Sequence, residues 1–295
     1  MASLIADDSR LQLLTTGYEW VEGPAWIAAT GRLRFSSIPA SEVLEYDAAS
    51  GEVHMHDADA EYANGRTVDA DGRVVQCSHG RRRVEREEAD GRLVGLADRW
   101  AGGRFNSPND VVVASDGAVW FTDPPYGIHE SGREGHPGEQ EYGACYVFRI
   151  DPATGEAEPV ITDMVHPNGL AFSPDESVLY VADTGFLWAD APREIRAYDV
   201  DGWACTGGRR FAVVPVGASD GFRVDEEGRI WTSAGDGVYV YSPGGELLEH
   251  VPVPETVSNV AFGGEDGRDL YITATTSLYR VRTTTRQAPR PAFRG

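Results

Sequence analysis

Apolar residues alternate with polar or small residues in short runs along most of the chain, and turn-forming residues separate these runs. The clearest example is the stretch 166–185, in which Leu170 and Phe172 alternate with smaller residues and a strand-forming run follows at 179–181. The residues between them, Ser-Pro-Asp-Glu at 173–176, have the composition of a tight turn. Alternation with a period of two on both sides of a turn predicts two antiparallel strands joined as a hairpin.

This hairpin recurs along the chain, and each copy begins with a polar residue that we call the head of the repeat. The heads are Glu22, Asn64, Asn109, Asn168, Asp220 and Ser258, and the last copy needs one inserted residue before its second strand. Repeats of roughly 40 to 50 residues with about four short strands each are typical of a β-propeller. The sequence therefore predicts an all-β fold, a six-bladed β-propeller with four antiparallel strands in each blade.

The last repeat has one strand fewer than the others before its pattern ends near Thr285. The alternating segment 10–15 precedes the first head, and we expect it to supply the missing outer strand, because closing the ring removes exposed strand edges. One propeller domain is therefore expected at 10–285, with an N-terminal tail at 1–9. The segment 286–295 shows no periodicity and is expected to be a disordered C-terminal tail.

The charge balance excludes several classes of partner and of chemistry. The chain has 47 acidic and 26 basic residues and a formal net charge of −21, which repels nucleic-acid phosphates and anionic membranes, so neither is expected as a partner. All the basic residues are arginine, so no lysine can form a Schiff base. The sequence contains neither a signal-peptide pattern nor a long apolar run. We expect a cytoplasmic, bacterial protein that is a monomer or a small homo-oligomer.

The heads of the repeats are the strongest candidates for a functional site. The innermost strands of a propeller crowd around its axis, so the heads are expected to face one another at one mouth of the central channel. Every head offers an oxygen atom, and the set contains two carboxylates but no His or Cys, which suits a hard divalent cation. Alternatively, Asn and Asp only form the turn into each strand. Glu22 is not a turn former, so the pattern favours a cation site.

Two insertions interrupt the repeats and are candidates for binding loops. The first, which we call the lid segment, spans residues 127–141 in the third repeat and is too polar to form core. Long loops on a rigid scaffold are commonly lids or binding loops, and the alternative is a plain surface excursion. The second insertion, in the fourth repeat, contains Trp188, which is expected either to line a pocket or to cover the edge of a blade.

Several motifs resemble those of the gluconolactonase and senescence-marker-protein family, which includes luciferin-regenerating enzyme and is related to diisopropylfluorophosphatase. The resemblance covers essentially the whole chain and is carried by Glu22-Gly-Pro and by the stretches 104–113, 120–127, 167–176 and 220–225. It implies a hydrolase that opens a lactone or a related ester. It also implies that Glu22, Asn168 and Asp220 bind the metal, and that Asn109 either joins them or holds the substrate.

The resemblance also suggests a mechanism and a set of substrate contacts. A bound divalent cation polarises the substrate carbonyl and lowers the pKa of a water molecule. We expect Ca²⁺, with Mg²⁺, Mn²⁺ or Zn²⁺ as alternatives, and we expect Asp220 to be the general base. Asn109, Ser107, Tyr126 and His129 are the expected substrate contacts, and Ser107 replaces an arginine of animal family members. The alternatives are a phosphotriester or other ester hydrolase on the same site, and a propeller that only binds a ligand.

Overall fold

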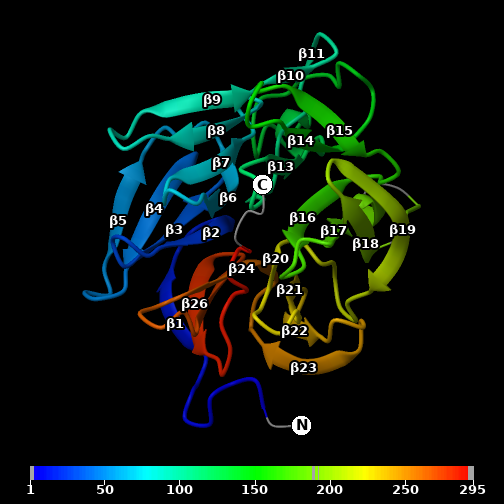
Figure 1. Ribbon diagram of the computed structural model, residues 1–295. Coiled ribbons are helices and arrows are strands. Elements are labelled where there is room, and N and C mark those ends of the chain that lie inside the picture. Colours follow the sequence, from blue (N-terminus) through cyan, green and yellow to red (C-terminus); the bar gives the residue numbers. More distant parts are fainter. Residues whose placement is uncertain (1–2, 188–189, 192, 292–295) are drawn as a thin grey trace.

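The computed structural model describes residues 3–187, 190–191 and 193–291. The described strands form six four-stranded antiparallel sheets, which are arranged like blades around a central axis (Figure 1). In every blade the strand that begins next to a head is the innermost one, and the following strands lie progressively farther out. The predicted all-β, six-bladed β-propeller is confirmed.

The blades follow one another along the chain. Blade 1 contains β2 (Val21–Ile27), β3 (Arg32–Ser37), β4 (Glu42–Asp47) and β5 (Val53–Asp57), and blade 2 contains β6 (Ala63–Val68), β7 (Val74–Ser78), β8 (Arg83–Glu87) and β9 (Leu93–Ala97). Blade 3 contains β12 (Val111–Val113), β13 (Val119–Thr122), β14 (Val147–Ile150) and β15 (Ala157–Ile161). A short hairpin of β10 (Arg99–Trp100) and β11 (Gly103–Arg104) lies between blades 2 and 3 in the sequence.

The second half of the ring repeats this plan. Blade 4 contains β16 (Pro167–Phe172), β17 (Val178–Asp183), β18 (Glu194–Asp201) and β19 (Ala204–Ala212), and blade 5 contains β20 (Phe222–Val224), β21 (Ile230–Ala234), β22 (Gly237–Tyr241) and β23 (Leu247–Pro252). Blade 6 contains β24 (Val257–Gly263), β25 (Asp269–Ala274), β26 (Ser277–Arg282) and β1 (Gln12–Thr16). Two 3₁₀ turns, η1 (Tyr126–Ile128) and η2 (Gly185–Leu187), follow the second strands of blades 3 and 4. None of the described helices is long and apolar enough to cross a membrane.

The N-terminal strand closes the ring as predicted. β1 pairs antiparallel with β26, and Leu13 lies opposite Tyr279. The apolar faces of blades 6 and 1 also pack together, because Tyr271 of β25 belongs to one buried cluster with Leu33 and Phe35 of β3. The first and last blades are therefore joined both by backbone hydrogen bonds and by core packing.

The two chain ends pack against the propeller more than predicted. Before β1, Ile5 forms a β-bridge with Thr283. At the other end, the Ala288 N–H donates to Val224 O at 3.0 Å and Arg290 donates to Val68 O at 2.7 Å. These carbonyls lie at the ends of innermost strands, far from the heads. The expectation of a disordered tail from residue 286 is therefore wrong for the described residues 286–291, because their backbone hydrogen bonds to blade 5.

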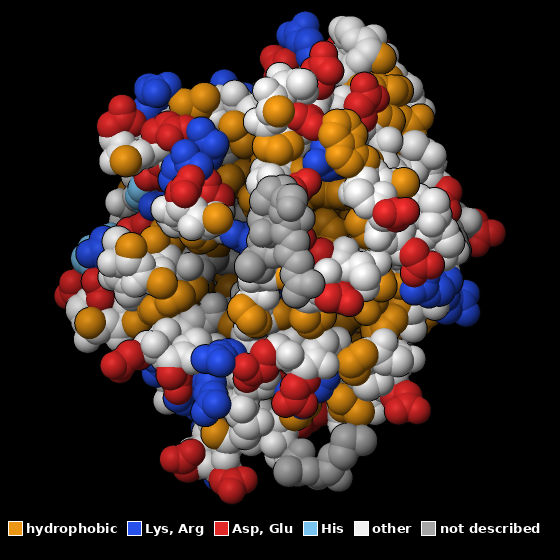
Figure 2. Space-filling view, in the orientation of Figure 1, with side chains coloured by type: hydrophobic (Ala, Val, Ile, Leu, Met, Phe, Trp, Pro, Cys, Tyr) orange, Lys and Arg blue, Asp and Glu red, His pale blue; other side chains and the backbone are white. Residues whose placement is uncertain are grey.

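Charged side chains of both signs are scattered over the face in view in Figure 2. Acidic and basic side chains are interspersed on this face. Exposed side chains of opposite charge pair at several places in the structure, as Arg99 does with Asp98 at 2.9 Å and Arg209 with Asp199 at 2.8 Å. This face therefore offers no single large patch of one sign.

Candidate functional site

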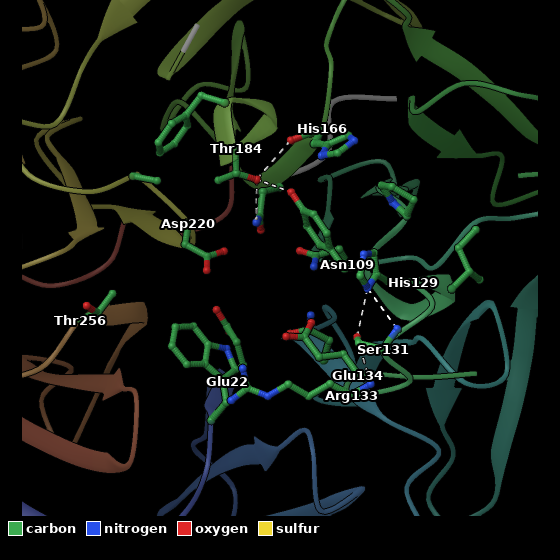
Figure 3. Close-up of a pocket in the computed structure, with 18 of the residues that line it drawn as sticks. Glu22, Asn109, His129, Ser131, Arg133, Glu134, His166, Thr184, Asp220 and Thr256 are labelled. Atoms are coloured by element: carbon green, nitrogen blue, oxygen red, sulfur yellow. Dashed lines mark hydrogen bonds between the residues drawn. The ribbon is translucent and has the colours of Figure 1, made fainter. Parts of the chain in front are cut away.

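A cavity of about 960 Å³ opens at the mouth of the propeller where the innermost strands begin. Five of the six predicted heads line it, Glu22, Asn64, Asn109, Asn168 and Asp220. Figure 3 shows the side chains of Glu22, Asn109 and Asp220 directed into the same open space from different blades. Residues that are up to about 200 positions apart in the sequence therefore meet in one site, as the aligned repeats predict.

The sixth head, Ser258, does not join this ring, and the prediction for it is wrong. Its side chain is fully buried, and its Oγ donates to Val21 O at 2.6 Å. The register of β24 and β25 shifts between Val257 and Asn259, and the Ser258 Oγ also lies 3.0 Å from Thr273 O of β25. In blade 6 the next residue approaches the site instead, because Asn259 Nδ2 donates to Glu22 Oε2 at 3.0 Å.

Glycines that follow the heads hold neighbouring blades together. The Gly65 N–H donates to Asn109 O at 2.8 Å, and the Gly169 N–H donates to Asp220 O at 3.1 Å. A Cβ atom on Gly65 would lie 2.5 Å from Asn109 O, and one on Gly169 would lie 2.1 Å from Asp220 O. Only glycine permits this approach. The backbone of one head is therefore fixed against the next blade, which sets the spacing of the side chains in the cavity.

The two carboxylates of the ring are electrostatically unfavourable as bare anions. Glu22 is buried, and burial raises its pKa to about 7, while the Gly23 N–H and Asn259 donate to it and oppose the rise. Burial, followed by the negative charge of Glu22, raises the pKa of Asp220 well above its ordinary value. Among the described residues, neither carboxylate forms a salt bridge. The site therefore favours a bound proton or a bound cation near these two groups.

The available donors match a hard cation. Asn109 and Asn168 add amide oxygens beside the two carboxylates. Asn168 Nδ2 donates to Thr184 Oγ1 at 3.3 Å, so the amide oxygen of Asn168 takes no part in that hydrogen bond. The described residues contain no group of three or more His, Cys, Asp or Glu that could hold a metal ion. A set of two carboxylates and two amides fits Ca²⁺ or a similar oxygen-preferring ion better than it fits a softer metal.

The lid segment covers the cavity. Its residues Ile128, His129, Glu130, Ser131, Arg133, Glu134, Gly138 and Gln140 line the space above the heads. The segment is tied down at several points, because Arg82 Nη2 donates to Glu139 O at 3.2 Å and Arg133 Nε donates to Glu19 at 3.1 Å. Its residues lie at the mouth of the propeller that carries Glu22.

Of the predicted substrate contacts Tyr126, His129 and Ser107, only the first two line the cavity. Tyr126 and His129 line the cavity, and the Tyr126 hydroxyl hydrogen-bonds with Thr184. Ser107 does not line it, because its side chain is fully buried, donates to Pro124 O at 2.6 Å and accepts the Gly127 N–H at 2.9 Å. Its position therefore supports the base of the lid segment and contradicts a substrate contact. Trp188 lies outside the described residues.

The sequence patterns did not reveal His79, which connects the ring to the lid segment. His79 is fully buried, its Nε2 lies 3.1 Å from Asn64 Nδ2, and its Nδ1 lies 2.9 Å from Glu134 O. A carbonyl only accepts, so Nδ1 carries the proton and Nε2 accepts from the amide. Burial lowers the pKa of His79 to about 4, which keeps the ring neutral. No periodicity marks this residue, because it follows the end of β7.

Comparison with known proteins identifies the family. A model of the SMP-30/gluconolactonase/LRE-like region matches residues 20–276. The chain belongs to this family. It is 31% identical to a gluconolactonase of Zymomonas mobilis, over 93% of this chain and 82% of that protein, and 31% identical to the pentonolactonase XacC of Haloferax volcanii, over 85% and 80%. A solved structure of a Xanthomonas campestris gluconolactonase is 40% identical, covers 95% of this chain and 91% of its own, and superposes with a TM-score of 0.89.

Proposed function

We propose that this family member is a metal-dependent hydrolase that opens a lactone ring. The observation that carries the proposal is the cavity in which Glu22 and Asp220 meet three amide side chains without a neutralising salt bridge among the described residues. The similarity to a gluconolactonase and to a pentonolactonase supports a lactone as the substrate class.

The ring of heads would hold the metal. Glu22, Asn168 and Asp220 are the proposed ligands, and Asn109 either completes the set or contacts the substrate. Ca²⁺ is the proposed ion, with Mg²⁺, Mn²⁺ or Zn²⁺ as alternatives, because the donors are hard oxygen atoms. When bound, such an ion polarises a carbonyl group and makes a water molecule more acidic.

The side chains of the chain itself perform the remaining steps. Asp220 accepts a proton from the attacking water while a new C–O bond forms at the lactone carbonyl carbon. The ring C–O bond then breaks, and the former ring oxygen takes the proton from Asp220 to become the alcohol of the open hydroxy acid, which restores the base. Tyr126 and His129 contact the substrate from above, and the lid segment limits the access of bulk water.

A substrate panel on metal-stripped protein tests this proposal. The panel contains a sugar lactone, an unsubstituted lactone, an aryl ester and a phosphotriester, each assayed without metal and with Ca²⁺, Mg²⁺, Mn²⁺ or Zn²⁺. The expected result is lactone hydrolysis that is lost on stripping and restored by one of these ions. Faster turnover of the ester or the phosphotriester would favour the alternative hydrolase. Thermal stabilisation by lactones without turnover under any condition would favour a binding propeller.

A further inference from the structure

A third carboxylate faces the cavity and does not belong to the ring of heads. Glu134 comes from the lid segment and lines the cavity together with Glu22 and Asp220. Figure 3 shows its side chain directed into the open space, on the side away from Asp220. Its charge also reaches the ring, because it contributes to the raised pKa of Asp220. A carboxylate in this position faces any molecule that is bound on the heads.

The backbone of Glu134 is held in place by contacts that depend on close packing. Glu134 O accepts the Nδ1–H of the buried His79 at 2.9 Å. The lid segment also folds back on itself, since a Cβ atom on Gly135 would lie 2.1 Å from Gly127 O. A Cβ atom on Gly127 would lie 2.5 Å from the Cβ of His79. The carboxylate is therefore carried by a segment that is fixed to blade 2, and a fixed group can select a ligand by its geometry.

The neighbours of Glu134 leave its oxygens available. Arg133 Nε is engaged by Glu19 at 3.1 Å, and His129 Nδ1 lies 3.0 Å from Ser131 Oγ. Within the described residues, the Glu134 carboxylate has no hydrogen-bond partner, although it is only partly exposed. Burial raises the pKa of Glu134, and the nearby charges of Arg133 and His129 oppose this rise. A half-buried acceptor without a protein partner is suited to hydroxyl groups of a ligand.

The remaining walls of the cavity define which hydroxyl-bearing molecule would fit. Trp20, Ile128, Phe186 and Val257 provide apolar surface, while the polar groups gather on the heads and on the lid segment. If the heads take the carbonyl end of a lactone, the rest of its ring lies between apolar walls and below Glu134. A sugar lactone has C–H faces for such walls and hydroxyl groups at its edge, whereas an alkyl lactone has no hydroxyl groups.

We propose that Glu134 is a specificity-determining residue that selects polyhydroxylated lactones by accepting hydrogen bonds from their hydroxyl groups. This inference rests on the proposed lactonase function and adds to it a residue that selects among lactones. A site built around a hydrogen bond discriminates strongly against the analogue that lacks the partner, because the buried acceptor is then left unsatisfied. Glu134 therefore determines which lactone is preferred, and the ring of heads carries out the hydrolysis.

The test compares two lactones that share the reacting bond. With saturating metal, kcat/KM is measured for glucono-δ-lactone and for δ-valerolactone with the wild type, Glu134→Ala and Glu134→Gln. In Glu134→Ala the preference for the hydroxylated lactone should fall about 10- to 100-fold, the usual effect of losing a hydrogen bond to a charged group. The readout is the ratio of the two kcat/KM values, because any effect of the Glu134 charge on Asp220 acts on both lactones. Glu134→Gln keeps the shape and one acceptor, so its loss should be smaller.

Glu139→Gln is the matched control, because Glu139 is an exposed glutamate of the same segment and does not line the cavity. It should leave both rates and the preference unchanged. An unchanged preference in both Glu134 variants, or an equal loss on both lactones, would overturn the specificity role. In either case an active wild type keeps the proposed function intact. A wild type that hydrolyses neither lactone with any metal would overturn the proposed function itself, and this inference with it.

Discussion

Replacing Asp220 by Asn separates metal binding from proton transfer, because it removes charge and basicity and keeps a side chain of the same size. The local backbone should be preserved. The Asp220 N–H donates to Ser233 Oγ at 2.8 Å, and Asp220 O accepts the Gly169 N–H at 3.1 Å. Both contacts involve only the backbone of residue 220. The variant should therefore fold, and its defects should report on the carboxylate.

The substitution should weaken metal binding and turnover, but it should stabilise the metal-free protein at high pH. Metal affinity should weaken, because the cation loses one of the two carboxylates that hold it. Turnover should fall further than the lost metal explains, by about 10²- to 10⁴-fold, the usual contribution of a positioned general base. In the metal-free state the variant should instead gain stability relative to wild type as the pH rises. The pKa of Asp220 is raised, so the folded wild type is destabilised once this group ionises, whereas Asn does not ionise.

The raised pKa of Glu22 gives the size of the loss of folding free energy that is expected when a buried carboxyl of this site ionises. Burial raises its pKa from 4.5 to about 7, so the stability that its protonated form contributes is fully present below pH 4.5 and lost as the pH rises through 7. A shift of this size corresponds to about 3 kcal/mol, a large fraction of the stability of a typical protein. Metal-free wild type should therefore melt at a lower temperature at pH 8 than at pH 5, and metal should largely remove this difference.

The decisive assay is turnover of Asp220→Asn at saturating metal, with occupancy checked by calorimetry. Asn168→Asp is the matched control, because it adds a carboxylate next to Asp220 and leaves the proposed base in place. It should bind metal at least as well as wild type. Turnover of Asp220→Asn close to wild type at full occupancy would refute the role of Asp220 as general base, and water activated by the metal would then suffice.

Two further predictions concern the scaffold. The pKa of His79 is lowered to about 4 from 6.5, so the neutral ring stabilises the fold above pH 6.5, and about 3 kcal/mol of this stability is lost as the pH falls to 4. His79→Gln should therefore lose less free energy of unfolding than wild type between pH 7 and pH 4 in urea titrations, and equal losses would contradict the assignment. Deletion of residues 1–16 should expose the edge of β26 and cause aggregation detectable by light scattering, whereas a soluble monomer of unchanged melting temperature would show that closure by β1 is dispensable.

The fold was predictable because its information is local and repeated. Each repeat carries the alternation and the turn residues that specify a hairpin, and several copies of a marginal pattern reinforce one another. The strand at 10–15 could be assigned from a missing partner in blade 6, and β1 confirmed it. The segment 286–291 was misjudged because it lacks a period, and its order comes from hydrogen bonds to carbonyls at the ends of β6 and β20. A tertiary contact of this kind leaves no pattern in the segment itself.

The site was only partly predictable, for two physical reasons. Five heads at equivalent positions line the cavity, whereas the short side chain of Ser258 is buried and its hydroxyl donates to backbone carbonyls of Val21 and Thr273. A shift of one residue redirects a side chain, so Asn259 takes the place next to Glu22. His79 and Glu134 come from loops, whose conformation follows from packing and not from alternation. Loop residues with functional roles therefore require the structure.

The propeller separates the stability of the site from its chemistry. The heads are joined to the neighbouring blades by backbone hydrogen bonds such as Gly169 to Asp220, and the ring is closed by β1 and by the buried cluster of blades 6 and 1. None of these contacts uses the carboxylates, so the fold does not require a cation to bring Glu22 and Asp220 together. The repulsion between the two groups is the cost of this arrangement, and a bound cation relieves it. Metal-stripped protein should therefore remain folded, and its loss of activity would report on chemistry and not on collapse of the scaffold.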